Sequence, residues 1–177
     1  KKNKVILFSP IGKKIDQNLI EKFVFSDHKN QQFSLICARY EGIDQRFIDS
    51  YVDEIWSLGD FVNTGGELAA IAFMDALLRR LPGTLGNSES SLNESFMNGL
   101  LEHPHYSRPE KFDSISVPSV LLSGHHAKIT KWRRQKSLEV TDRNRSDLIT
   151  KAREAGRLSE EDEYWLSELK KKGYKKE

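Results

Sequence analysis

The chain has 177 residues, of which 37% are hydrophobic and 31% are charged, and its formal net charge is +2. This length suits one domain with an appendage or two small domains, and it is enough to bury a hydrophobic core. The only cysteine, Cys37, excludes an internal disulfide and fits a reducing compartment, so we expect a cytoplasmic protein. The longest strongly apolar segment, Leu68–Leu78, contains Asp75 and is too short to span a bilayer, so no membrane association is expected.

The first half of the chain alternates short apolar runs with helical patterns. Val5–Phe8 and Phe33–Cys37 are typical of buried strands, and Ser9–Gly12 predicts a loop after the first strand. A helix capped by Asp16 is expected between them, and strands separated by a helix form a parallel pair. A short helix near residues 45–50 and a strand ending at Leu58 repeat this organisation. The pattern therefore predicts an α/β fold with a parallel sheet.

The stretch Ser57–Leu68 is the centre of this organisation, because an apolar run ends there, three glycines follow and a helix begins. Thr64 and Glu67 match the capping-box spacing of a helix N-terminus. Glycines let the main chain approach a ligand closely, which suits an adenine or a ribose. A tight strand-to-helix turn without a ligand is the alternative, and composition alone favours it. The ends of the three strands fall on one sheet edge, where α/β proteins bind ligands.

The helix expected from Glu67 to Arg80 is apolar on nearly every side. We expect it to be buried all round, in a large core or with one face against another subunit. Asp75 is either a hydrogen-bonded core acid, which we favour, or an interface residue. The small polar segment Gly86–Asn93 is the best linker in the chain. The predicted domains are residues 1–86 and 98–177, joined by a flexible linker at residues 87–97. Because the chain begins at Lys1 directly before a strand, we also expect that an N-terminal portion precedes this numbering.

The second half carries a basic helix that is expected to begin near Gly124. Between His125 and Asp147 there are seven lysines or arginines and three acids, a local charge of +4. Such a helix either lies in solvent or meets the phosphates of a nucleic acid. A last helix is expected to open at Ser159, with Asp162 in the capping position and an apolar patch of Trp165, Leu166 and Leu169.

Four histidines of this half, His103, His105, His125 and His126, raise the question of a metal site. Their spacing matches no closed zinc pattern, and Cys37 lies far away in the sequence. No metal site is therefore predicted.

Four motifs of the chain together resemble a known family: Arg39–Asp44, Thr64–Leu68, Pro104–Pro109 and Val120–His126. From about Lys4 to Leu148 the sequence resembles the bacterial tRNA (guanine-N1)-methyltransferases called TrmD, of the SPOUT class. The resemblance implies a parallel α/β domain with a C-terminal trefoil knot, a flexible linker and a small helical C-terminal domain. It also implies a homodimer, S-adenosylmethionine as methyl donor, and tRNA methylated at N1 of the guanine 3′ to the anticodon.

Carried over by this resemblance, the cofactor-binding positions are the three strand ends described above. Four of them differ from the family's usual residues: Ala38 replaces Gly, Phe61 replaces Tyr, Asn63 replaces Leu and Ala69 replaces Pro. The resemblance further implies that the family's N-terminal portion, with its first strand and a glycine-rich loop, is absent from this numbering. The predicted cofactor-binding residues are Phe8, Ser9, Pro10, Ala38, Tyr40, Glu41, Ser57, Leu58, Gly59, Phe61, Asn63, Gly65, Gly66 and Ala69.

Methylation of guanine N1 requires a base that removes its proton and a cation that stabilises the charge spreading to O6. By resemblance these roles fall to Glu94, where the family usually has Asp, and to Arg79. Without the resemblance, Glu94 is interpreted as a solvated loop acid and Arg79 as a cation at a helix end. An RNA-binding or dimerisation module that keeps the fold without catalysis is the alternative function. A SPOUT relative acting on another base is a third possibility, against which Arg79, Glu94 and the Pro104–Tyr106 motif argue jointly.

Overall fold

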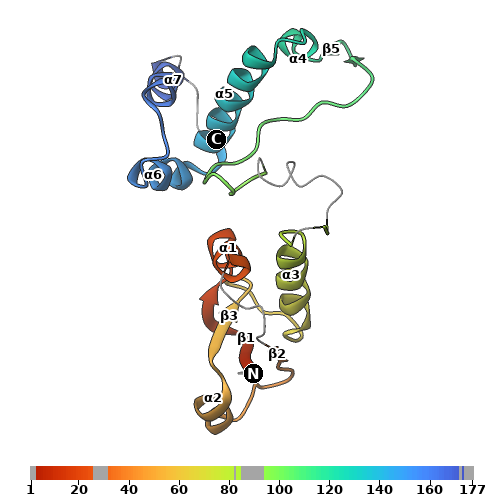
Figure 1. Ribbon diagram of the computed structural model, residues 1–177, viewed down its shortest axis with the longest axis vertical. Helices are drawn as coiled ribbons and strands as arrows, with labels where there is room; N and C mark the ends of the chain where they lie inside the picture. The colour runs from red at the N-terminus through yellow and green to blue at the C-terminus, as the bar shows by residue number, and fades with distance from the viewer. Residues whose placement is uncertain (1–2, 26–31, 82, 85–93, 172, 174–177) are drawn as a thin grey trace. The chain divides into compact units, whose positions relative to one another are not determined.

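The computed structural model describes residues 3–25, 32–81, 83–84, 94–171 and 173, which Figure 1 draws in colour. The chain forms two compact units, Lys1–Ser88 and Glu89–Glu177. The boundary between the units falls within the predicted linker at residues 87–97. Residues 87–93 of that segment lie outside the described residues, so the flexible linker stays a prediction.

The first unit is a parallel sheet with helices, as the sequence predicts. Its strands occur in the order β2-β1-β3, and β1 pairs in parallel with both neighbours. Asp16 caps α1 through a hydrogen bond from the Leu19 amide to its Oδ1 at 2.8 Å. The trefoil knot stays a prediction. In chain order the elements are β1 (Asn3–Lys14), α1 (Gln17–Phe25), β2 (Gln32–Cys37), α2 (Gln45–Tyr51), β3 (Glu54–Ser57) and α3 (Glu67–Leu78).

Strand β1 is longer than predicted, because the chain continues in extended form through Ser9–Gly12 instead of leaving the sheet as a loop. Its register with β3 shifts after Phe8, so that both Phe8 and Lys13 lie opposite Trp56. This irregularity explains how Pro10 is tolerated inside a strand. A Cβ on Gly12 would lie 2.5 Å from the Ile55 carbonyl carbon, so only glycine permits this approach of the two strands.

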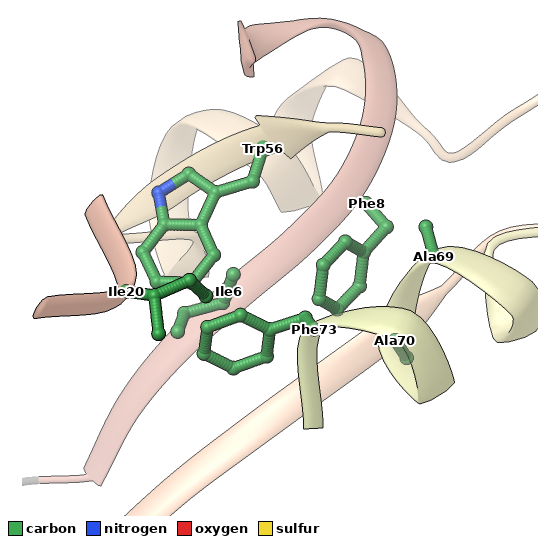
Figure 2. Packing of buried hydrophobic residues seen from close by; sticks show 7 residues of the cluster. All are labelled: Ile6, Phe8, Ile20, Trp56, Ala69, Ala70 and Phe73. Atoms are coloured by element: carbon green, nitrogen blue, oxygen red, sulfur yellow. The ribbon is translucent and has the colours of Figure 1, made fainter. Parts of the chain in front are cut away.

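The core of the first unit is built mainly from aromatic rings, as Figure 2 shows. The Trp56 and Phe73 ring centroids are 4.9 Å apart, and Phe8 packs against both rings. The indole N–H of the buried Trp56 donates to Glu54 Oε2 at 2.7 Å, so its polar atom is satisfied. The buried residues of this core are Ile6, Phe8, Ile20, Trp56, Ala69, Ala70 and Phe73.

Helix α3 begins at Glu67, as predicted, but its N-terminal cap differs from the prediction. Gly66, with φ of −74°, is the N-cap residue and offers no side-chain hydrogen bond. The predicted capping box between Thr64 and Glu67 is therefore wrong. The carboxylate of Glu67 instead accepts a hydrogen bond from Arg39 Nε at 2.6 Å. With Gly66 as the N-cap, Glu67 is the first helical residue and not the third, which is the position that a capping box requires.

Within the first unit α3 is not buried all round, so the predicted large core is wrong, and the alternative of one face against another subunit stays a prediction. One face, with Ala69, Ala70 and Phe73, belongs to the core, but the opposite face is open. Asp75 is exposed, so its interpretation as a core acid is wrong. The helix is apolar on nearly every side, yet a sheet of three strands covers only one side of it. The open face carries Leu68, Ile71, Met74 and Leu78, whose exposed fractions are 57%, 57%, 39% and 50%.

The second unit is mainly helical. Leu100, at the start of the unit, packs with side chains of α5, α6 and α7 in a separate core. No described helix has the length and apolar character needed to cross a membrane. In chain order the elements are β4 (Lys111–Phe112), β5 (Ile115–Ser116), α4 (Ser119–Leu122), α5 (His126–Asn144), α6 (Ser146–Glu154) and α7 (Glu160–Lys171).

The start of α7 confirms the capping pattern that the sequence predicts. The Ser159 amide donates to Asp162 Oδ2 at 2.9 Å, and the Asp162 amide donates to Ser159 Oγ at 3.2 Å. Asp162 is also paired with Arg134 of α5 at 2.8 Å. Burial alone would raise the pKa of Asp162, but the hydrogen bonds from Arg134 and Ser159 outweigh it and lower that pKa. The carboxylate therefore caps α7 and joins it to α5.

Candidate active site

A cavity of about 260 Å³ lies at the carboxyl edge of the parallel sheet. All fourteen residues that the sequence analysis assigns to a cofactor line it, from Phe8 at the end of regular β1 pairing to Ala69 in α3. Their roles in binding stay predictions, but their convergence follows from three parallel strands ending side by side. The lining residues that sequence reasoning missed are Arg39, Gly42, Trp56, Val62 and Thr64. All five lie in the same strand ends as the predicted residues, so their position beside those residues could have predicted them.

The loop before α3 is fastened to the end of β2 by backbone contacts. The Gly66 amide donates to the Ala38 carbonyl at 3.0 Å, and Arg39 and Gly65 form an antiparallel bridge. A Cβ on Gly66 would lie 2.9 Å from Cys37 Cα, so the contact requires glycine. The glycines of this loop thus bring two strand ends close enough to share one cavity.

Tyr40 has an unusual backbone conformation at the rim of this cavity. Its φ is 61°, in the left-handed region, and its side chain is 99% exposed. A non-glycine residue in that region carries about 1–3 kcal/mol of strain, and such residues cluster at ligand sites. An exposed aromatic ring held beside a cavity can cover part of a ligand.

An ion pair between Arg39 and Glu67 sets the charge at the same rim. The hydrogen bond from Arg39 lowers the pKa of Glu67, and the carboxylate in turn raises the pKa of Arg39. Both side chains are largely exposed, so the pair contributes little to stability. Burial, followed by the charge of Glu67, raises the pKa of the Cys37 thiol. Cys37 is therefore a neutral thiol, not an activated nucleophile.

Ser57 has a structural part in the cavity wall. It is only 3% exposed, and its hydroxyl donates to the Gly59 carbonyl at 3.1 Å. The Gly59 amide lies 3.3 Å from the same oxygen. These contacts hold the turn after β3, so the backbone of Gly59 is fixed where a ligand would meet it.

The two residues assigned to catalysis belong to different units. Arg79 is the C-cap of α3 in the first unit, and its amide donates to the Asp75 carbonyl. Glu94 is half-buried in the second unit, where its carbonyl accepts from the Met97 amide at 3.3 Å. Neither is among the residues that line the cavity. Their catalytic roles stay predictions.

A second cluster of functional side chains lies in the second unit. Donor atoms of Glu102, His103 and His105 all lie within 4.8 Å of one another. The prediction that the chain has no metal site considers histidine spacing alone and leaves Glu102 out. An extended segment brings the carboxylate to the two imidazoles.

Comparison with known proteins agrees with the resemblance seen in the motifs. A model of the family described as tRNA (Guanine-1)-methyltransferase TrmD matches residues 1–151. Three similar proteins are named tRNA (guanine-N(1)-)-methyltransferase. The one from Polynucleobacter necessarius is 50% identical over 169 residues, which are 96% of this chain and 66% of that protein. The one from Cupriavidus metallidurans is 53% identical over 165 residues, 93% of this chain and 62% of that protein.

The third relative, from a Janthinobacterium strain, is 49% identical over 166 residues, 94% of this chain and 65% of that protein. The chain thus spans a little less than two thirds of the length of each of these relatives. The family match covers both the strand ends around the cavity and most of the described helical unit. This chain belongs to the tRNA (guanine-1)-methyltransferase family TrmD.

Proposed function

We propose that the chain transfers a methyl group from S-adenosylmethionine to N1 of the guanine 3′ to the anticodon in tRNA. The observation that carries the proposal is the cavity at the sheet edge, which all fourteen residues assigned to the cofactor line. Membership of a family named for guanine-1 methylation supports the reaction. Its relatives bear the same activity in their names.

The cavity fits the adenosine part of this cofactor. Its volume of about 260 Å³ is close to the lower end of small-molecule pockets, about 300 Å³. The backbone of Gly59, Gly65 and Gly66 would hold the adenine and ribose, and Tyr40 would cover them. When bound, the cofactor supplies an electrophilic methyl group, which the N1 lone pair receives as the carbon–sulfur bond breaks.

The chain's own acid and cation would prepare the guanine. Neutral guanine carries a proton on N1, so its nitrogen has no lone pair in the ring plane. Glu94 takes that proton, and Arg79 stabilises the negative charge that spreads to O6. Because Glu94 lies in the predicted linker, closure over bound RNA would exclude water at the moment of proton transfer.

A homodimer is the assembly that we propose for this function. The exposed face of α3 presents Leu68, Ile71, Met74 and Leu78 at helical spacing. The exposed Asp75 lies among these side chains, but the four apolar residues around it form a stripe, and an apolar stripe on a surface marks an interaction site. A second copy of the same helix is self-complementary to it, which a two-fold dimer requires.

The tRNA would meet the second unit through α5. Of the seven cations between His125 and Asp147, four are paired with acids: Lys131 with Glu161, Arg134 with Asp162, Lys136 with Glu139 and Arg145 with Asp147. Lys128 and Arg133 have no ion pair within the described part of the chain and are the first candidates for phosphate contacts. The surface available for phosphate contacts therefore has fewer cations than the local net charge of +4 suggests.

Calorimetric titration with S-adenosylmethionine tests the cofactor site, and transfer of its labelled methyl group to tRNA tests the reaction. We expect both binding and transfer. Binding of tRNA without any transfer would favour the alternative function, an RNA-binding or dimerisation module without catalysis. A folded chain that binds neither the cofactor nor its demethylated product would contradict the assignment of the cavity.

A further inference from the structure

We propose that Glu102, His103 and His105 form a binding site for a divalent transition-metal ion, with Zn²⁺ as the best fit. The three donor atoms lie within 4.8 Å of one another. Imidazole nitrogens with one carboxylate are a ligand set that binds Zn²⁺, Ni²⁺ and Cu²⁺ well, whereas Mg²⁺ and Ca²⁺ prefer oxygen alone. None of these three residues lines the cavity in the first unit, and the proposal does not rest on the proposed methyl transfer.

The ring of His103 is held in the orientation that a metal ligand needs. Its Nδ1 lies 3.1 Å from the Pro104 carbonyl oxygen. A carbonyl only accepts hydrogen bonds, so the proton belongs on Nδ1 and the lone pair on Nε2. A hydrogen bond from the far nitrogen to a backbone carbonyl is the usual outer support of a metal-bound histidine. His103 can therefore bind an ion through Nε2 without rearrangement of this contact.

His105 and Glu102 already point at each other. Nε2 of His105 lies 2.8 Å from Oε1 of Glu102, and the rings of His103 and His105 are 4.7 Å apart. Ligands around a tetrahedral zinc lie about 3.3 Å apart, given bond lengths of about 2.0–2.1 Å. The nitrogen and oxygen therefore need to separate by only about half an ångström. An ion bound between the two side chains would replace the direct contact that now joins them.

The backbone at Leu101 and Glu102, where the first of the three ligands stands, is anchored by hydrogen bonds. The Leu101 amide donates to Thr141 Oγ1 at 2.9 Å, and the Glu102 amide donates to Ser95 Oγ at 2.9 Å. The neighbouring Leu100 is fully buried in the core of the unit. Ligands on a backbone that is already anchored lose less entropy when they bind an ion. Three protein ligands leave the remaining position to water, as in an open zinc site.

The charges near the site set its strength. Arg133 and Arg134 line a cavity of about 250 Å³ together with Glu102 and His103. Asp162 offsets the charge of Arg134, but Arg133 is exposed and repels a cation. We therefore expect a weaker site than a closed structural zinc site, and a tighter one after Arg133→Ala.

Calorimetric titration of the full chain, without a polyhistidine tag, with Zn²⁺ tests the proposal. We expect one bound ion per chain, and His105→Gln should raise the Kd about tenfold or more. His105 is exposed, so its substitution removes a ligand without disturbing the core. His126→Gln removes another exposed histidine, outside the cluster, and should leave the Kd unchanged. Equal Kd values for wild type and His105→Gln would overturn the proposal, as would equal losses in both variants.

Fluorescence gives an independent readout of position. The ring of His103 lies 6.4 Å from that of Trp132, so Ni²⁺ or Cu²⁺ in the site should quench this indole. Trp56 and Trp165 still emit in Trp132→Phe, so the quenching should become weaker in this variant, and it should also weaken in His105→Gln and Glu102→Gln. Equal quenching of wild type and Trp132→Phe would place the ion elsewhere and contradict the site. Absence of both heat and quenching at millimolar metal would contradict it as well.

Discussion

At the scale of single residues, two adjacent glycines of the candidate site have different physical roles. A Cβ on Gly66 would lie 2.9 Å from the backbone Cα of Cys37, which cannot move without disturbing β2. A Cβ on Gly65 would meet only the carboxylate end of Glu67 and the side chain of Arg39, both of which can turn away. Gly66 has an ordinary negative φ, so its requirement is steric and not conformational.

We therefore predict that Gly66→Ala lowers the free energy of unfolding more than Gly65→Ala does. Overpacking against backbone costs about 1–3 kcal/mol, whereas a displaced surface ion pair costs less than about 1 kcal/mol. Urea denaturation of both variants measures the difference. Equal losses, or a larger loss for Gly65→Ala, would show that the two strand ends are not in close contact.

A second prediction at this scale concerns Asp162. Replacing it with Ala removes the α7 cap and leaves the guanidinium of Arg134 unpaired, so we expect a loss of about 2–4 kcal/mol. Its folded pKa is lowered, so the carboxylate stabilises the fold above its unfolded pKa of about 3.9. That contribution disappears as the pH falls through the lowered folded pKa.

Denaturation curves of wild type and Asp162→Ala across this acidic range measure the effect. The matched control is Glu161→Ala, because Glu161 forms an exposed pair with Lys131 and should cost less than about 1 kcal/mol. A difference between wild type and Asp162→Ala that stays constant from neutral pH to below the folded pKa would contradict the role of the charge.

At the scale of elements, periodicity predicted most of the first unit, because strands and helices that are buried on one side repeat apolar residues at a fixed spacing. It also predicted the convergence of the three strand ends, since parallel strands end on one edge. It did not predict that β1 continues past Pro10. That continuation depends on the close contact of Gly12 with β3, which lies more than forty positions further along the chain.

Local sequence also failed at a hairpin turn, at a helix start and at the Glu102 cluster. The hairpin of β4 and β5 turns through Asp113 and Ser114, both with positive φ. Turns of this kind usually have Asn-Gly or Asp-Gly at these positions, so the sequence does not indicate the hairpin. Thr64 and Glu67 have the spacing of a capping box, but Gly66 is the N-cap. The Glu102 cluster was missed because histidine spacing alone does not include a neighbouring acid.

The open face of α3 leads to a prediction about assembly. Ile71→Asp places a charge in the middle of the exposed apolar stripe and should convert a dimer into a monomer. Leu122→Asp is the matched control, because Leu122 is similarly exposed, at 54%, in the other unit. Light scattering at micromolar concentration distinguishes the two states. If the wild type is a monomer, or if Ile71→Asp remains a dimer, α3 does not form the proposed interface.

At the scale of the whole molecule, we expect Arg79 and Glu94 to act together on one guanine, with Arg79 from the other subunit. Arg79→Ala and Glu94→Gln should each leave cofactor binding nearly intact and slow transfer by about 10²-fold or more. Mixed dimers of the two variants should regain about one working site, which carries one intact residue from each chain. If both parents bind cofactor and tRNA but the mixture stays inactive, the pair does not act across an interface.

The most direct measurement is nucleoside analysis of tRNA after incubation with labelled S-adenosylmethionine. Two substrates are compared, one with guanine 3′ to the anticodon and one with adenine at that position. We predict label in 1-methylguanosine of the first tRNA alone, and about 10²-fold less when Glu94 is replaced by Gln. Label in another nucleoside, equal label in both tRNAs, or a rate that Glu94→Gln does not change would contradict it.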